Sequence, residues 1–212
     1  MRLSKLTSTL SVMTATSLAL CGASFAQVCP PKTPLTNFTF AMVPTLGIES
    51  CVKNARGRVT ITHTPQEEEN MHVEMTGLPK NTDFDLFVIQ KPGPEFGLSW
   101  YMGDMLTDAT GAAVADFIGR FNIGTFIVAP GSEPAPVVPL PPGAFQDANS
   151  NPATKPVQLF HIGLWFDSPA DANKQGCGSV VTPFNSTHNA GVQAMNTSNF
   201  PDLAGPLCTV AR

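Results

Sequence analysis

Short runs in which apolar and polar residues alternate constrain the fold of this chain more than any other feature. Val59 and Ile61 share one face of the run 58–62, and the run 71–76 alternates in the same way. This period of two is typical of β-strands with one buried side. The run 83–90 is apolar on both faces, which predicts a central or covered strand. Helical spacing is absent from 37–128.

The turn residues between these runs divide the chain into short strands and one short helix. Ser168 or Asp167 can cap a helix, Pro169 suits its first turn, and Gly176 would end it. The stretch 65–70 is polar and is expected to be a solvated loop. The sequence predicts an all-β fold, a single antiparallel β-sandwich that is immunoglobulin-like or similar. The expected strands are 37–43, 58–62, 71–76, 83–90, 97–102, 112–118, 125–128, 157–166 and 190–195.

A proline-rich excursion interrupts the strands between residues 130 and 156. Eight of these 27 residues are proline, and proline cannot donate to a β-ladder. We therefore expect an irregular segment. Its apolar residues predict that it packs on the domain rather than extending freely; they are Val137, Val138, Leu140 and Phe145.

The first 26 residues have the organisation of a secretory signal peptide. Basic residues come first, the apolar stretch 10–20 follows, and Ser24 and Ala26 stand at the −3 and −1 positions of a cut before Gln27. A lipoprotein signal at Cys21 is the alternative, but Leu20 stands where such signals carry a small residue. The sequence thus predicts a secreted protein, extracellular or periplasmic, with one mature domain over 27–212.

Charge and hydropathy of the mature part exclude several classes of partner. The chain has 12 Lys and Arg and 16 Asp and Glu; the leader holds two of the basic residues and none of the acidic ones, so the mature balance is 10 minus 16, or −6. The cations are scattered, which argues against nucleic acid as a partner. No segment after the leader reaches the ~20 apolar residues of a membrane helix, so no membrane insertion is expected.

Four cysteines remain after cleavage: Cys29, Cys51, Cys177 and Cys208. An even number in an exported protein predicts disulfides, and three pairings are possible. We favour the local pairs Cys29–Cys51 and Cys177–Cys208, because each would fix one end of the chain to the domain. A metal site is the alternative, but there is no C-x-x-C and the four histidines show no ligand spacing. No metal and no cofactor are expected.

Several runs resemble a family of uncharacterised secreted bacterial proteins that are mostly β. These runs are 77–90, 96–101, 161–170, 182–185 and 188–193. The resemblance covers most of the mature chain. It implies an exported bacterial β protein, and it carries over no activity and no catalytic residue.

The sequence offers candidate binding residues rather than a catalytic motif. It contains no Gly-x-Ser-x-Gly elbow, no His-Glu-x-x-His and no phosphate loop. His161 and Trp165 project from one face of a predicted strand, which the chain around 185–193 is expected to cover in part. An aromatic ligand pocket is the hypothesis, and separate residues with local hydrogen bonds are its alternative. The proposed members are His161, Trp165, His188, Trp100 and Tyr101.

Two groups of carboxylates have simpler interpretations. Asp83 and Asp85 share a strand face, and we take them as the solvated start of that strand rather than as an acid–base pair. Asp104, Asp108 and Thr110 could bind calcium through oxygen, but a hairpin turn explains them better.

The sequence therefore favours a non-catalytic binding or structural module with an unknown extracellular ligand or protein partner. The alternative is an extracellular hydrolase that acts on a polymer through carboxylate or histidine residues. Convergence of two candidate acid–base residues in one cleft would favour the enzyme. The candidates are Asp83, Asp85, Asp104, Asp108, His161 and His188.

Overall fold

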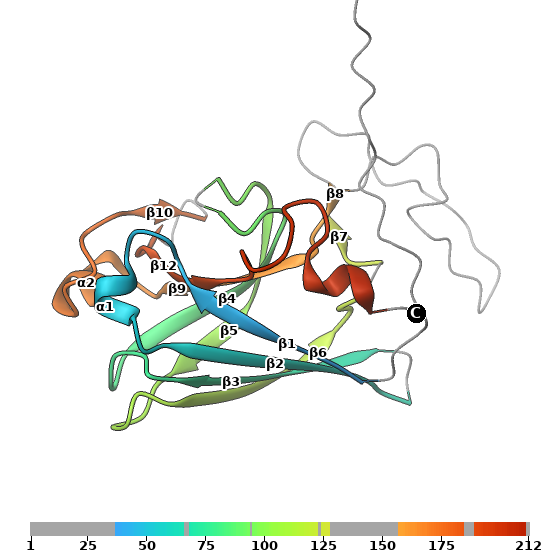
Figure 1. The fold of residues 1–212 in the computed structure, drawn as a ribbon, viewed down its shortest axis with the longest axis horizontal. Helices are drawn as coiled ribbons and strands as arrows, with labels where there is room; N and C mark the ends of the chain where they lie inside the picture. The colour runs from blue at the N-terminus through green and yellow to red at the C-terminus, as the bar shows by residue number, and fades with distance from the viewer. Residues whose placement is uncertain are drawn as a thin grey trace, which may run out of the picture.

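The computed structural model describes residues 37–65, 68–93, 95–122, 124–127, 157–184 and 189–210 (Figure 1). Eight strands form one antiparallel sheet in the order β5-β4-β9-β12-β1-β2-β3-β6, which confirms the predicted all-β class. The predicted leader and proline-rich excursion lie outside the described residues. The strands are β1 (Asn37–Pro44), β2 (Arg56–His63), β3 (Glu69–Thr76), β4 (Asp83–Ile89), β5 (Ser99–Leu106), β6 (Ala113–Gly119), β9 (His161–Phe166) and β12 (Gln193–Asn196).

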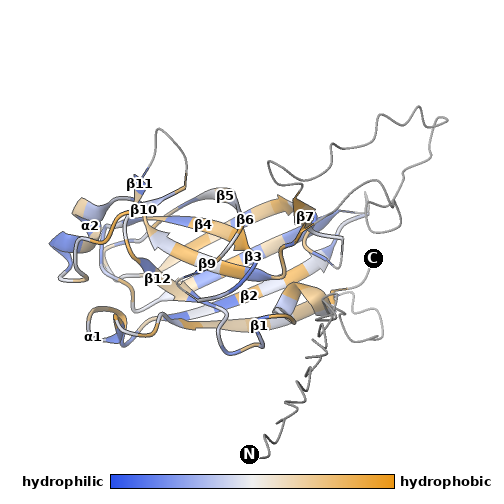
Figure 2. Ribbon diagram, turned by 90° about the horizontal axis from the view of Figure 1, so that it is seen from above, coloured by the Kyte–Doolittle hydropathy of each residue, from blue (hydrophilic) through white to orange (hydrophobic). Residues whose placement is uncertain are grey.

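The sheet curls so that its two halves face each other across one core (Figure 2). β1 joins the halves, because residues 37–42 pair with β2 whereas Val43 and Pro44 pair with β12. The result is a sandwich joined along one side, close to a barrel. Its seam lies between the edge strands β5 and β6, which have no ladder between them.

Alternation along the strands fills the core as the sequence predicted. Val59, Val73 and Leu164 are each 0% exposed, and the core cluster draws on both halves of the sheet. On β9 the even-numbered residues face this core and the odd-numbered ones face outward, because successive side chains of a strand point to opposite sides.

The smaller elements lie at the ends of the sandwich. β7 (Phe126–Ile127) pairs with β8 (Val157–Gln158), and β10 (Thr182–Pro183) pairs with β11 (Asn189–Ala190). The predicted helix is α2 (Pro169–Lys174), and Ser168 caps it by accepting a hydrogen bond from the Asp171 backbone N–H. Three short elements were not predicted: the strand β10, the helix α1 (Glu49–Val52) and the 3-10 helix η2 (Pro206–Thr209). No helix among the described residues is long and apolar enough to cross a membrane.

The prediction of a solvated loop over 65–70 is wrong for its last two residues. Glu69 and Asn70 begin β3, and Glu69 is only 1% exposed. Glu69 is in phase with Met71 and Val73, so the pleat turns its side chain toward the interior.

The disulfide connectivity differs from the predicted local pairs. Cys51 of α1 bonds Cys177, which follows α2; their Cα atoms are 5.5 Å apart and 126 residues separate them in sequence. The predicted pairs Cys29–Cys51 and Cys177–Cys208 are therefore wrong. Cys208 is disulfide-bonded as well. The curled sheet brings both helices to the same end of the molecule, which a local pairing rule cannot anticipate (Figure 1).

Candidate functional site

The structure places His161 inside the protein rather than in an open pocket. Its side chain is 0% exposed. Nδ1 lies 2.9 Å from the Thr197 hydroxyl, and Nε2 lies 3.2 Å from the carbonyl oxygens of Pro201 and Asp202. Burial lowers the pKa of His161, because a charged imidazole would lose its hydration. This histidine fastens the C-terminal segment to β9.

Trp165 lies in an aromatic cluster on the outer face of the same half-sheet. Its ring contacts those of Phe87, Phe96 and Phe184 at centroid distances of 5.5, 5.1 and 5.0 Å. Phe184, just before the predicted cover 185–193, stacks on Phe87 at 3.8 Å, and Ala190 of that stretch packs in the same cluster. Trp165 is 1% exposed, so the expectation of only a partial cover is wrong at this residue. His188 lies outside the described residues.

The neighbours Trp100 and Tyr101 point to opposite sides of β5. Tyr101 opposes Phe87 in the ladder, and the two rings are 5.5 Å apart on the outer face. Trp100 opposes Val88, whose side chain belongs to the core. The residues proposed as one pocket therefore occupy three separate environments.

Three carboxylates meet beside Tyr101. One oxygen from each of Asp85, Asp104 and Asp167 lies within 4.8 Å of the others, and Asp85 is 1% exposed. The solvated-start interpretation thus holds for the exposed Asp83 and is wrong for Asp85. The Tyr101 hydroxyl donates to Asp104. Burial, followed by this hydrogen bond and the negative charges, raises the pKa of Tyr101.

These carboxylates are the described residues that could hold a hard cation, which prefers oxygen ligands. The calcium site suggested for Asp104, Asp108 and Thr110 does not form. Asp108 instead accepts hydrogen bonds from the Thr110 and Ala112 backbone N–H groups and from the Thr110 hydroxyl, as the hairpin-turn interpretation requires. The Thr110 hydroxyl and these N–H groups lower the pKa of Asp108.

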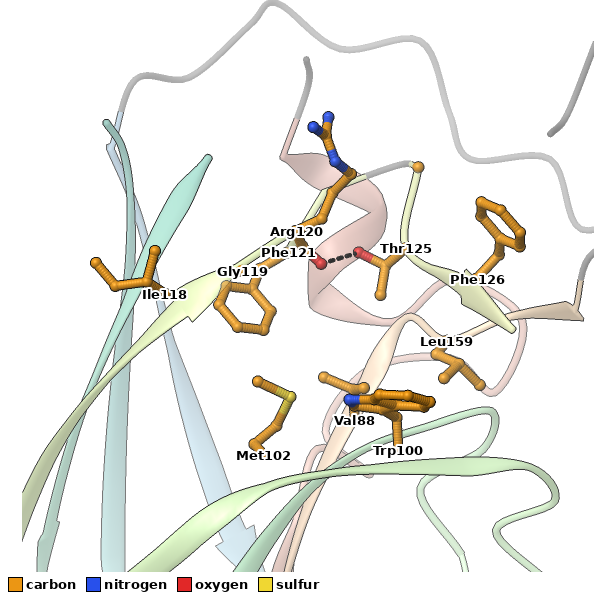
Figure 3. A pocket seen from close by; sticks show the side chains of 11 residues that line it. Val88, Trp100, Met102, Ile118, Gly119, Arg120, Phe121, Thr125, Phe126 and Leu159 are labelled. Atoms are coloured by element: carbon orange, nitrogen blue, oxygen red, sulfur yellow. Dashed lines mark hydrogen bonds between the residues drawn. The ribbon is translucent and has the colours of Figure 1, made fainter. Parts of the chain in front are cut away.

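A cavity of about 350 Å³ opens between the edge strands, at the end where β5 begins and β6 ends (Figure 3). We call it the groove. Trp100 is 60% exposed there although it faces the core side of β5, so interior apolar surface reaches solvent. The lining residues are Val88, Trp100, Met102, Ile118, Gly119, Arg120, Phe121, Gly124, Thr125, Phe126 and Leu159.

Irregular strand pairing shapes one wall of the groove. Leu86 pairs with Gly103 and Phe87 with Tyr101, so Met102 is the extra residue of a β-bulge. Further along the seam the Phe117 ring packs on Gly103; a Cβ added to Gly103 would lie 2.8 Å from the Phe117 Cε1 atom. That contact fills the seam and ends the groove.

A buried carboxylate holds the opposite wall. Glu69 Oε2 accepts the Phe121 backbone N–H at 2.8 Å, and Oε1 accepts the Asn122 side-chain amide at 2.7 Å. His63 Nδ1 lies 3.2 Å from the same Oε1 atom. Inside the loop, the Thr125 hydroxyl donates to the Arg120 carbonyl at 2.7 Å (Figure 3). These bonds attach the loop that carries Phe121 and Thr125 to β3, so both residues are held in the wall of the groove.

Among the described residues that line the groove, Arg120 is the only charged one. No ion pair found in the described part of the chain involves it. Its guanidinium group points away from the Trp100 indole (Figure 3).

No protein-family model matches the chain, and no curated protein matches it. The resemblance to secreted bacterial proteins stays a prediction. The groove and its residues are therefore the basis for proposing a function. Of the four predicted site residues that the structure describes, only Trp100 lines this groove. Phe126, Met102 and Glu69 were missed, although the in-phase position of Glu69 on β3 was a readable signal.

Proposed function

We propose that the protein is an exported, non-catalytic binding module and that the groove holds its ligand. The observation that carries the proposal is Trp100, a core-facing indole that is 60% exposed at the mouth of an apolar cavity. Small-ligand sites are commonly concave, apolar and aromatic, with few polar groups. The mouth of a curled sheet is a frequent place for them.

Two features support the exported character. The Cys51–Cys177 disulfide requires an oxidising compartment to persist, and such bonds are rare in the cytosol. Residues 1–26 have the order of charged, apolar and small residues that directs secretion.

The direct test is titration with a neutral apolar dye whose fluorescence increases in apolar surroundings. Trp100→Ala should reduce dye affinity at least fivefold and cost little stability, because the indole is already largely exposed. Leu106→Ala is the matched control, since Leu106 is 64% exposed on the same strand outside the groove. Equal dye binding by the two variants would remove the groove as the ligand site.

A polymer hydrolase is the second candidate, because one observation favours it. Asp85 and Asp104 lie close together, which meets the proximity that the enzyme hypothesis required of two candidate residues but not the shared cleft. They do not line the groove, however, and His161 is enclosed. Polysaccharide hydrolysis by the purified protein that is abolished in Asp104→Asn would establish this function and displace the binding module.

A further inference from the structure

We propose that the ligand of the groove is a single-chain amphiphile with an anionic head, whose alkyl chain enters the groove while Arg120 pairs with the head. The inference rests on the proposed function and specifies the chemistry of its ligand. Three observations carry it: the apolar walls, the internal use of the polar groups near them, and the isolated charge at the rim.

The walls of the groove suit an alkyl chain. Val88, Phe121 and Leu159 are buried and Met102 is half-buried, so a chain that enters the groove meets apolar atoms at its inner end. Methionine is flexible and polarisable and adapts to such chains. Each methylene transferred from water contributes about 0.8 kcal/mol in the general case.

Two of the polar groups beside these walls are already engaged. The Thr125 hydroxyl donates to the Arg120 carbonyl and accepts from the Asn122 N–H. The Gly124 N–H donates to the Asn122 side-chain oxygen. A sugar or another polyhydroxylated ligand would bury hydroxyl groups without partners here, which is costly. The groove therefore favours an apolar chain over a polar ring.

The charge at the rim selects the head group. Arg120 is exposed and is the only charged residue of the lining within the described part of the chain, whose formal net charge over its full length is −4. Its guanidinium points out of the apolar space (Figure 3), so an anionic head can stay hydrated at the rim while the chain inserts. Guanidinium pairs with carboxylate through two parallel hydrogen bonds. A cationic head would be repelled at the same place.

The two tryptophans make contact with the chain directly measurable. Trp100 is 60% exposed in the groove, whereas Trp165 is 1% exposed in the aromatic cluster. We would titrate the protein with ω-bromododecanoate and with the neutral ω-bromododecanol, both below their aggregation concentrations, because bromine quenches a contacted indole. Quenching should affect Trp100 and should disappear in Trp100→Phe.

Two arginine variants test the head group. The carboxylate should bind about fivefold more tightly than the alcohol, the upper end of what an ion pair at an exposed rim contributes. Arg120→Gln should remove that preference and leave the affinity for the alcohol unchanged. Arg58→Gln is the control, because Arg58 is an exposed arginine of β2 paired with Glu74. It should keep the fivefold preference.

The outcomes separate this inference from the proposed function. Equal affinities for carboxylate and alcohol, or a preference that survives Arg120→Gln, would overturn the anionic head while leaving the groove as a binding site. Quenching that persists in Trp100→Phe would place the probe elsewhere and overturn the inference. If neither probe quenches Trp100 and the neutral dye of the first test does not bind, the proposed function fails as well.

Discussion

Replacement of Glu69 by alanine tests how a buried carboxylate supports the groove. Glu69 is 1% exposed, and its two oxygens accept hydrogen bonds from the Phe121 backbone and the Asn122 side chain. In Glu69→Ala both donors lose their acceptor inside the protein. An unsatisfied buried donor costs about 1–3 kcal/mol, so the variant should lose about 4 kcal/mol of unfolding free energy.

The matched control lies on the same strand. Glu74 is on the outward side of β3 and pairs with Arg58 at 3.8 Å, with 44% of its side chain exposed. Exposed ion pairs contribute little, so Glu74→Ala should change the unfolding free energy by less than about 1 kcal/mol. Both variants would be measured by urea denaturation followed by circular dichroism, with the neutral dye titration run on the folded protein.

The binding measurement links this stability effect to the site. Without Glu69 the loop that carries Phe121 and Thr125 is no longer fixed to β3, so Glu69→Ala should also weaken dye binding while Glu74→Ala should not. A loss below about 1 kcal/mol in Glu69→Ala, or an equal loss in Glu74→Ala, would refute the reasoning.

Three further predictions concern the termini, the disulfides and pH. Replacing both Cys51 and Cys177 by serine should cost about 5 kcal/mol from loop entropy, given their separation of 126 residues. Peptide mapping should then find Cys208 linked to Cys29, the remaining cysteine outside the predicted leader. Burial lowers the pKa of His161, so the unfolded chain binds more protons than the folded protein. The contribution of His161 to the unfolding free energy is therefore present above its unfolded pKa of about 6.5 and is lost as pH falls below that value. In His161→Gln the unfolding free energy, measured by denaturation, should depend less on pH in this range. Mass spectrometry of secreted protein should find Gln27 at the N-terminus, and an intact leader or a lipid on Cys21 would contradict export by this signal.

Local alternation was sufficient to predict the longer strands, but not the two-residue strand β10. The runs 58–62, 71–76 and 83–90 coincide with β2, β3 and β4 to within a few residues. These strands have an apolar face that a period of two reveals in any short window. The capped helix at Ser168 was predictable for a similar reason, because its signals lie within one turn.

Contacts between residues far apart in the chain could not be predicted from the sequence. The Cys51–Cys177 bond depends on how the whole sheet curls, and the meeting of Asp85 with Asp167 depends on β9 lying beside β4. The grouping of Trp100 with Tyr101 was an avoidable error. Consecutive strand residues face opposite sides, so the same alternation that predicted the strand already separated the two rings.

The groove follows from the order of strands together with the loop that follows β6. β5 and β6 are consecutive in the chain, yet β5 pairs with β4 and β6 pairs with β3, which leaves a seam between them. Phe117 on Gly103 fills that seam, and beyond it the interior is open at Trp100. A ligand that contacts both edge strands would therefore bind only the folded sheet. By linkage, a concentration one hundred times its dissociation constant would raise the unfolding free energy by about 2.7 kcal/mol.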